Sequence, residues 1–176
     1  MEPSNYIRAA KVIGVTGAAW LGGNIAALSL IAVPALRRSG VEAGVPSSIL
    51  AKQWRFLYDT GKAQNPPIAT VTAAAYLYLA WSARRIAPLG QLPLYYGSAA
   101  VLTLGIVPFT LIAMHSTNNR LMQHSEQAAS KSVSTPLQPA SDDEVDGLIA
   151  KWIILNGVRS LFPLAGGILG IIAILG

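Results

Sequence analysis

The sequence predicts an all-α integral membrane protein, in which four transmembrane helices form a bundle with a short amphipathic helix in the first long loop. Three observations support this prediction. The chain contains four long apolar segments, its mean hydropathy is +0.46, and only 12% of its 176 residues are charged, about half the share that is usual in soluble domains. The charged residues gather between the apolar segments. We therefore expect one membrane domain over residues 1–176.

The first predicted span covers residues 12–36, which include no charged side chain. At about 1.5 Å per residue, this segment is long enough to cross a hydrocarbon core of roughly 30 Å. A cleaved signal peptide has a shorter apolar region, so we expect this helix to be retained. The second predicted span covers residues 66–84 and begins at two prolines, which are favoured in the first turn of a helix.

The third predicted span covers residues 93–114, and the fourth covers residues 150–175. Tyr95 and Tyr96 lie near the start of the third, where aromatic side chains mark a membrane interface. Gly166 and Gly170 are four residues apart in the fourth, a spacing that allows close helix packing.

The two long connections differ in character. In residues 48–62, Trp54 and Tyr58 recur at helical spacing among cationic residues, which predicts a short amphipathic helix at the interface. Residues 123–141 are rich in Ser, Ala, Gln and Pro. This composition has little apolar surface to bury and predicts a flexible loop.

Composition and motifs exclude several classes of function. The net charge is +5, but there is no basic stripe with aromatic readers, so we expect no nucleic-acid partner. The cations fit membrane flanks, where they contact lipid headgroups. The chain has no cysteine, which excludes disulfides and thiolate metal ligands. Phosphate-binding loops, dinucleotide fingerprints, nucleophile elbows and heme-attachment motifs are absent from the sequence.

Polar residues within the predicted spans are candidates for function, because such groups are costly in hydrocarbon. Trp152, Asn156 and Arg159 share one helix face by their spacing. Alternatively, Arg159 reaches a loop carbonyl near the headgroups. Asn24 lies among small residues, where an amide also serves helix packing. His115 ends an apolar segment, where a histidine is also common as an interfacial residue.

The two histidines do not predict a metal site. His124 lies in the predicted flexible loop, and the nearest acid is Glu126 beside it. A site built from imidazoles would need both histidines and a carboxylate. We therefore expect no metal ligands in this chain.

Four blocks of sequence resemble the anthrone oxygenase family of fungal polyketide biosynthesis, whose members are four-span membrane proteins. Together they extend over nearly the whole chain, and the third is the most specific. The blocks are TGAAWLGGNIAALSLIAVPAL (16–36), QWRFLYDTGK (53–62), PFTLIAMHSTNNRL (108–121) and WIILNGVRS (152–160).

The resemblance implies an enzyme that converts an anthrone to an anthraquinone with O2 as co-substrate and without a dedicated organic cofactor. Deprotonating the central methylene of an anthrone gives a delocalised, electron-rich carbanion that reacts with O2. Such a site needs a dry, flat pocket, a proton acceptor and donors for the developing oxyanion. The implied partners are an aromatic polyketide and membrane lipid, and the implied location is the endoplasmic reticulum or another endomembrane.

On this reading, His115 is the base, Arg159 and Asn156 contact the oxyanion and a neighbouring hydroxyl, and Asn118 completes the polar set. The predicted substrate-binding residues are mainly aromatic and supply walls for a planar molecule. They are Trp20, Asn24, Gln53, Trp54, Tyr58 and Trp152.

Other interpretations remain open at the level of sequence. A non-enzymatic scaffold or transporter subunit would use the same amides and arginine for helix packing. An oxygenase with a bound metal or heme would keep the oxygen chemistry. A homo-oligomer is compatible with either.

Overall fold

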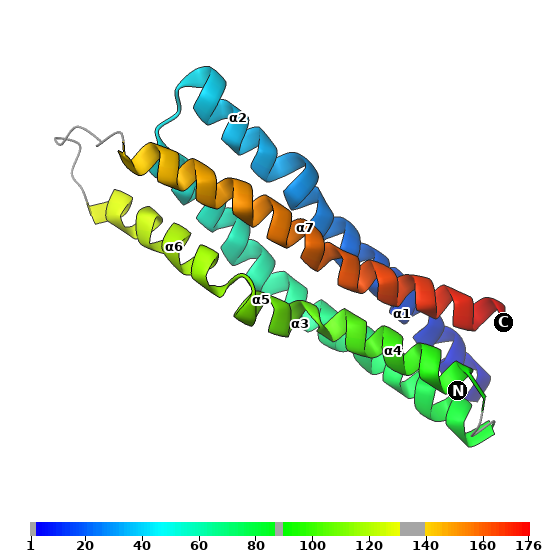
Figure 1. Ribbon diagram of the computed structural model, residues 1–176. Coiled ribbons are helices and arrows are strands. Elements are labelled where there is room, and N and C mark those ends of the chain that lie inside the picture. Colours follow the sequence, from blue (N-terminus) through cyan, green and yellow to red (C-terminus); the bar gives the residue numbers. More distant parts are fainter. Residues whose placement is uncertain (1–2, 87–89, 131–139) are drawn as a thin grey trace. The chain divides into compact units, whose positions relative to one another are not determined.

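The computed structural model describes residues 3–86, 90–130 and 140–176 (Figure 1). Side chains are described in these ranges except at residues 3, 128–130, 140 and 141. Helices are the only regular secondary structure in the described residues, which confirms the predicted all-α class. The chain divides into two compact units. Unit 1 contains Met1–Asn24, Gln64–Phe109 and Arg159–Gly176, and unit 2 contains Ile25–Ala63 and Thr110–Val158.

The first predicted span lies within a run of helix that has no loop. It consists of α1 (Pro3–Ala27), the π-helical turn η1 (Leu28–Ala32) and α2 (Val33–Ala43). The wider π turn comes directly before Pro34, whose ring would clash with a carbonyl of a regular α-helical turn. The helix ends at Gly44, which has a φ of 64°, a left-handed conformation that favours glycine.

The second predicted span and the amphipathic segment form one helix, α3 (Ser47–Ile86), of 40 residues. The prediction of a separate short helix before Pro66 and Pro67 is therefore wrong. Proline has a helical φ and strains a helix locally without having to begin one. In α3 the Pro66 carbonyl accepts a 2.9 Å hydrogen bond from the Thr70 hydroxyl.

The third predicted span is divided into α4 (Leu92–Leu104) and α5 (Ile106–Ile112), with a break at Gly105. Pro108 explains the break, because it has no N–H to donate to the carbonyl of Leu104. The helical pattern resumes where the Phe109 N–H donates to the Gly105 carbonyl at 3.1 Å.

Helix α6 (His115–Ser130) extends into the segment for which we predicted a flexible loop. Residues 123–130 are helical, so the loop prediction is wrong there, and residues 131–139 lie outside the described residues. Leu121 and Ser125, four residues apart, are both buried on α6. This narrow buried face stabilises a helix whose overall composition is polar. The chain ends with α7 (Ala140–Leu175), which includes the fourth predicted span.

Three helices of the described chain are long and apolar enough to cross a membrane. These candidate spans are Ser4–Ala43, Leu92–Ile112 and Asp142–Leu175. They match the first, third and fourth predicted spans and are consistent with a multi-pass membrane protein. The second predicted span, in α3, is not among them.

Unit 1 is built from close contacts between small residues and two tyrosines. The ring of Tyr76 stacks on Tyr96 at a centroid distance of 6.4 Å. Tyr76 also lies against Gly14 of α1 and Gly170 of α7, where an added Cβ would lie 2.7 and 2.5 Å from its ring and hydroxyl. A Cβ at Gly166 would lie 2.9 Å from the Ala99 carbonyl oxygen. The predicted packing role of Gly166 and Gly170 is confirmed.

Unit 2 has ion pairs that join its helices. Arg37 of α2 binds Asp146 of α7 through two hydrogen bonds, of 2.7 and 2.8 Å. Arg55 of α3 lies 3.1 Å from Glu126 of α6. A further pair joins Arg120 of α6 to Glu144 of α7. These ion pairs link α2, α3, α6 and α7 within unit 2.

Candidate functional site

Three of the predicted aromatic residues form a cluster in unit 2. The Trp54 ring stacks on Tyr58 at a centroid distance of 5.1 Å and an interplanar angle of 17°. It meets Trp152 edge to face at 5.9 Å and 87°. Trp54 and Trp152 are 0% and 1% exposed, so α3 and α7 bury both indoles. The helical spacing of Trp54 and Tyr58 in the sequence accounts for their stacking on one face of α3.

Two buried amides lie around this cluster. The Trp152 indole Nε1 donates a 3.0 Å hydrogen bond to the Asn118 Oδ1, which joins α7 to α6. One turn further along α7, the Asn156 Nδ2 donates to the Ile25 carbonyl at 2.9 Å and to the Ser29 hydroxyl at 2.8 Å. Ser29 is presented by the π turn η1. Unit 2 therefore contains Asn118, Trp152 and Asn156, and a hydrogen bond joins the first two directly.

Two polar atoms of this group have no hydrogen-bond partner among the described residues: the Trp54 Nε1 and the Asn156 Oδ1. One is a donor and the other an acceptor. An unsatisfied buried polar group costs about 1–3 kcal/mol, so such groups are uncommon unless they bind something. The two indoles of the cluster differ in this respect, since Trp152 donates to Asn118. The cluster therefore contains one unpartnered buried donor and one unpartnered buried acceptor.

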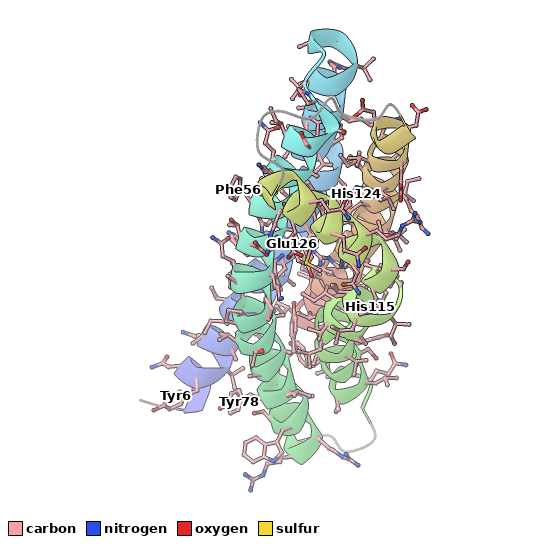
Figure 2. The ribbon with its side chains drawn as sticks, turned by 90° about the vertical axis from the view of Figure 1, so that its left-hand side faces the viewer. Tyr6, Phe56, Tyr78, His115, His124 and Glu126 are labelled. Carbon is pink, nitrogen blue, oxygen red and sulfur yellow. The ribbon has the colours of Figure 1, made fainter. Side chains whose placement is uncertain are left out.

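His115 is exposed at the start of α6 (Figure 2). Its Nε2 lies 2.9 Å from the Asn119 side-chain nitrogen. His124 lies further along α6, and its Nε2 is 3.5 Å from the Glu144 carboxylate. Among the residues that the structure describes, no three His, Asp or Glu side chains gather in a way that could hold a metal ion.

Trp20 and Gln53 are exposed, although we expected both in the pocket. Trp20 of α1 is 43% exposed. Gln53 directly precedes the buried Trp54, and consecutive residues on a helix point about 100° apart. Their part in substrate binding stays a prediction.

Asn24 and Arg159 belong to unit 1. The Asn24 Nδ2 donates a 3.0 Å hydrogen bond to the Asn65 Oδ1 of α3, which fits the packing role that we weighed for it. Arg159 is partly buried on α7, three residues after Asn156. Its part in catalysis stays a prediction.

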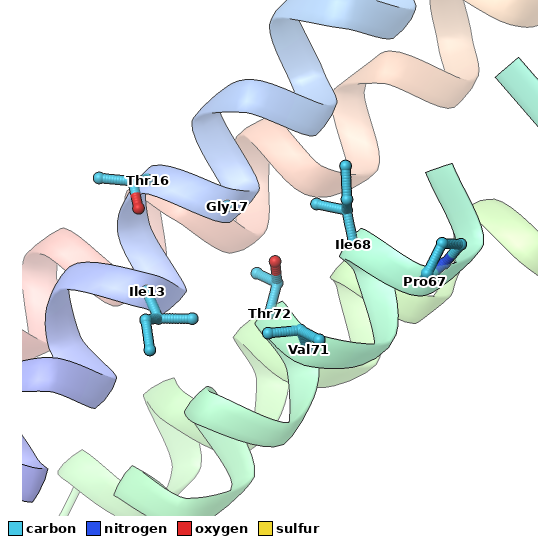
Figure 3. A pocket seen from close by; sticks show the side chains of 7 residues that line it. All are labelled: Ile13, Thr16, Gly17, Pro67, Ile68, Val71 and Thr72. Atoms are coloured by element: carbon cyan, nitrogen blue, oxygen red, sulfur yellow. The ribbon is translucent and has the colours of Figure 1, made fainter. Parts of the chain in front are cut away.

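Unit 1 also has an apolar groove of about 340 Å³ between α1 and α3 (Figure 3). Ile13 and Thr16 line it from α1, and Pro67 and Val71 from α3. The Thr72 hydroxyl points toward Gly17, where an added Cβ would lie 2.1 Å from it. The groove therefore lies beside a close helix contact that depends on a glycine.

The sequence analysis missed two buried polar residues of unit 1, Asn65 and Thr72, which are 3% and 1% exposed. Both lie in or beside the second predicted span. The sequence signal available for them was an uncharged polar side chain in or beside an otherwise apolar segment. Their partners on α1 depend on helix packing, which spacing along α3 does not reveal.

Comparison with known proteins identifies the family. A sequence model of the anthrone oxygenase family matches residues 54–169. The chain is 39% identical to anthrone oxygenase encC of Aspergillus fumigatus, over 94% of this chain and 92% of that protein. It is 36% identical to anthrone oxygenase tpcL of the same organism, over 92% and 89%.

A third relative, noranthrone monooxygenase of Aspergillus flavus, is 32% identical over 94% of this chain and 73% of that protein. No solved structure matches the chain. The family match spans well over half of the sequence, and these relatives align with nearly all of it. The chain belongs to the anthrone oxygenase family.

Proposed function

We propose that this protein is a membrane-embedded anthrone oxygenase that converts a polyketide anthrone to the corresponding anthraquinone. The observation that carries the proposal is the buried aromatic and amide cluster of unit 2, found in a chain whose relatives are named anthrone oxygenases and monooxygenases. The substrate is a flat, apolar molecule with a carbonyl and phenolic hydroxyls. Its flat ring system matches the aromatic faces of the cluster. Its carbonyl matches the unpartnered donor, and a phenolic hydroxyl matches the unpartnered acceptor.

The reaction balances with O2 alone. A base removes one proton from the central methylene, and the resulting carbanion passes an electron to O2. The two radicals join through a C–O bond, and the peroxide loses water to give the new carbonyl. One oxygen atom enters the product and the other leaves as water, so that CH2 and O2 become C=O and H2O.

In this proposal, the Trp54 Nε1 donates to the carbonyl oxygen of the substrate, where negative charge grows on deprotonation. A preorganised donor in a dry site stabilises such a charge strongly. The Asn156 Oδ1 accepts from a neighbouring phenolic hydroxyl. Asn118 holds Trp152 through its indole N–H, so that the ring keeps its position against Trp54. Trp20, Gln53 and His115 are exposed and are left outside the proposed site.

We also propose that the C-terminal part of α3 is a fourth span, as the sequence predicted. Residues 64–83 include no charged side chain, and about 20 helical residues cover a hydrocarbon core of roughly 30 Å. In unit 1 this part of α3 packs with segments of the three candidate spans. The proposed location is the endoplasmic reticulum or another endomembrane.

The proposed reaction uses no dedicated organic cofactor. Metal and heme analysis of the purified protein tests this part of the proposal. A stoichiometric transition metal or heme that is required for turnover would replace it with a cofactor-dependent mechanism.

The test of the function is the oxidation of an anthrone in air by the purified protein in lipid nanodiscs. We expect anthraquinone absorbance to rise well above the spontaneous rate, with one O2 consumed per anthraquinone formed. Folded protein that gives no acceleration for any of several anthrones would contradict the proposal and favour a scaffold or transporter subunit.

A matched pair of tryptophan variants tests the site. Trp54→Phe keeps an aromatic ring and removes the buried N–H, and we expect kcat to fall by about 100-fold, the scale for loss of one oxyanion donor. Trp81→Phe is the control, because Trp81 is 55% exposed in unit 1. Equal rates for the two variants would remove Trp54 from the proposed mechanism.

A further inference from the structure

Unit 1 has a second cavity, of about 200 Å³, at the end where the chain termini lie. Residues of α1, α3, α4 and α7 line it. The lining is apolar except for a lysine and two hydroxyls, one of which, on Tyr96, donates to the Ala173 carbonyl at 3.2 Å. Lys11 of α1 and Ser82 of α3 are the remaining polar side chains of the lining.

The charges around this cavity have one sign. Arg8 is one turn from Lys11 on α1, and Arg84 and Arg85 lie between the lining residues Ala83 and Ile86 on α3. The described part of unit 1 includes no Asp or Glu. None of these four cations therefore has an acidic partner within that part of unit 1, whereas unit 2 pairs its arginines with carboxylates.

The surroundings of the cavity are those of a membrane interface. The Arg85 guanidinium lies over the Trp81 ring, 4.9 Å from the centroid, and Trp81 is itself half-exposed. Ile86 and Leu92 are exposed beside it. Tryptophan and arginine are typical of the headgroup region, so the open side of the cavity fits a lipid.

We propose that this cavity binds one anionic glycerophospholipid, with its phosphate beside Lys11 and Ser82 and part of one acyl chain in the apolar cavity. Charge complementarity selects the ligand, because the described part of unit 1 offers these cations no acidic side chain. The apolar lining requires that this anion carry a hydrocarbon chain. The site belongs to unit 1, whereas the proposed catalytic cluster belongs to unit 2, and the proposal does not depend on the proposed enzymatic function.

Native mass spectrometry of the delipidated full-length protein in detergent tests this proposal. The probes are phosphatidylglycerol and phosphatidylcholine with identical acyl chains. We expect phosphatidylglycerol to bind at least about fivefold more tightly, the scale for one cation near an anionic headgroup. Equal binding of the two lipids would overturn the proposal.

Variants of Lys11 and Ser82 distinguish a specific lipid site from non-specific electrostatic attraction to the protein. Lys11→Gln should lower phosphatidylglycerol affinity by about fivefold, while Lys52→Gln, in unit 2, should leave it unchanged. Ser82→Phe fills the cavity without changing any charge and should reduce phosphatidylglycerol binding to the phosphatidylcholine level. Full binding by Ser82→Phe, or equal effects of the two lysine variants, would contradict the proposal. Ser82→Leu repeats the test if the phenylalanine variant does not elute as folded protein.

Discussion

Units 1 and 2 are each built from segments of several helices, but different interactions hold those segments together. In unit 1, glycines and alanines allow the helices to approach closely around Tyr76 and Tyr96. In unit 2, ion pairs join the helices at their surfaces, while indoles and amides fill the interior. Helix packing is thus stabilised in a different way in each unit.

The two units differ in how far they rely on close packing and on polar contacts. Lipid tails are as apolar as leucine, so helices in lipid are held by close packing more than by the hydrophobic effect. Exposed apolar side chains of unit 1, such as Val12, Val101 and Leu175 at 62%, 70% and 82%, fit that environment. Unit 2 also exposes apolar side chains, such as Leu30 and Ile112, but adds exposed ion pairs that fit water or headgroups. The buried indoles and amides of the proposed catalytic cluster lie in unit 2, whereas Arg159 belongs to unit 1.

The largest expected effect concerns the two asparagines that make hydrogen bonds between helices. Asn156→Leu in unit 2 removes the unpartnered acceptor and the bonds to Ile25 and Ser29, and we expect kcat to fall by about 100-fold or more. Asn24→Leu in unit 1 removes only the bond to Asn65 and should change kcat by less than about threefold. Anthraquinone absorbance measures both rates.

Circular dichroism and size-exclusion chromatography show whether both asparagine variants remain folded. A large loss of turnover in Asn24→Leu, with Asn156→Leu unaffected, would place the site in unit 1 and reverse the comparison.

The next effect concerns stability and uses two glycines of α7. Gly166→Ala in unit 1 places a Cβ 2.9 Å from a backbone oxygen of α4, whereas the nearest atom to a Cβ at Gly157 in unit 2 is 3.7 Å away. We expect Gly166→Ala to destabilise the protein by about 1–3 kcal/mol, the scale of overpacking. Gly157→Ala should be neutral or slightly stabilising, because alanine favours helix.

Thermal unfolding in the same detergent compares the two glycine variants. Equal midpoints would show that unit 1 does not depend on close helix approach at this position.

The parts of the fold that the sequence predicts best are those that depend on composition. Length and hydropathy are sums over many residues, and the predicted spans that contain Val12, Pro93 and Trp152 fall within long apolar helices. Helix ends depend on single residues, and there the predictions fail. Pro66 was expected to begin a helix, but it lies inside α3. Ser125 was expected in a loop, but it lies on the buried face of α6.

The candidate site was predictable where it depends on spacing within one helix. The i, i+4 relation of Trp152 and Asn156 predicted a shared face on α7, and Trp54 with Tyr58 did the same on α3. Contacts between helices depend on how each helix is rotated about its axis. That rotation exposes His115 and Gln53 and buries Trp54, and spacing along one chain segment does not determine it.

A smaller effect is expected from the ion pairs of unit 2. The side chains of Arg37 and Asp146 are 45% and 39% exposed, so a double-mutant cycle of Arg37→Gln with Asp146→Asn should give a coupling of at most about 1 kcal/mol. The coupling should shrink in about 1 M salt, where exposed charges are screened. A coupling that salt does not change would indicate a pair shielded from solvent, and would weaken the contrast between the units.

The smallest expected effect is that of His115, the residue that the sequence favoured as the base. Its ring is exposed and its Nε2 is occupied by Asn119, so His115→Gln should lower kcat by less than about threefold, whereas loss of a general base costs about 10²–10⁴. The pH profile of kcat distinguishes the two outcomes. If the variant loses most of its turnover together with the acidic limb of that profile, an exposed imidazole takes the proton. The catalytic groups of unit 2 would then include its surface as well as its buried cluster.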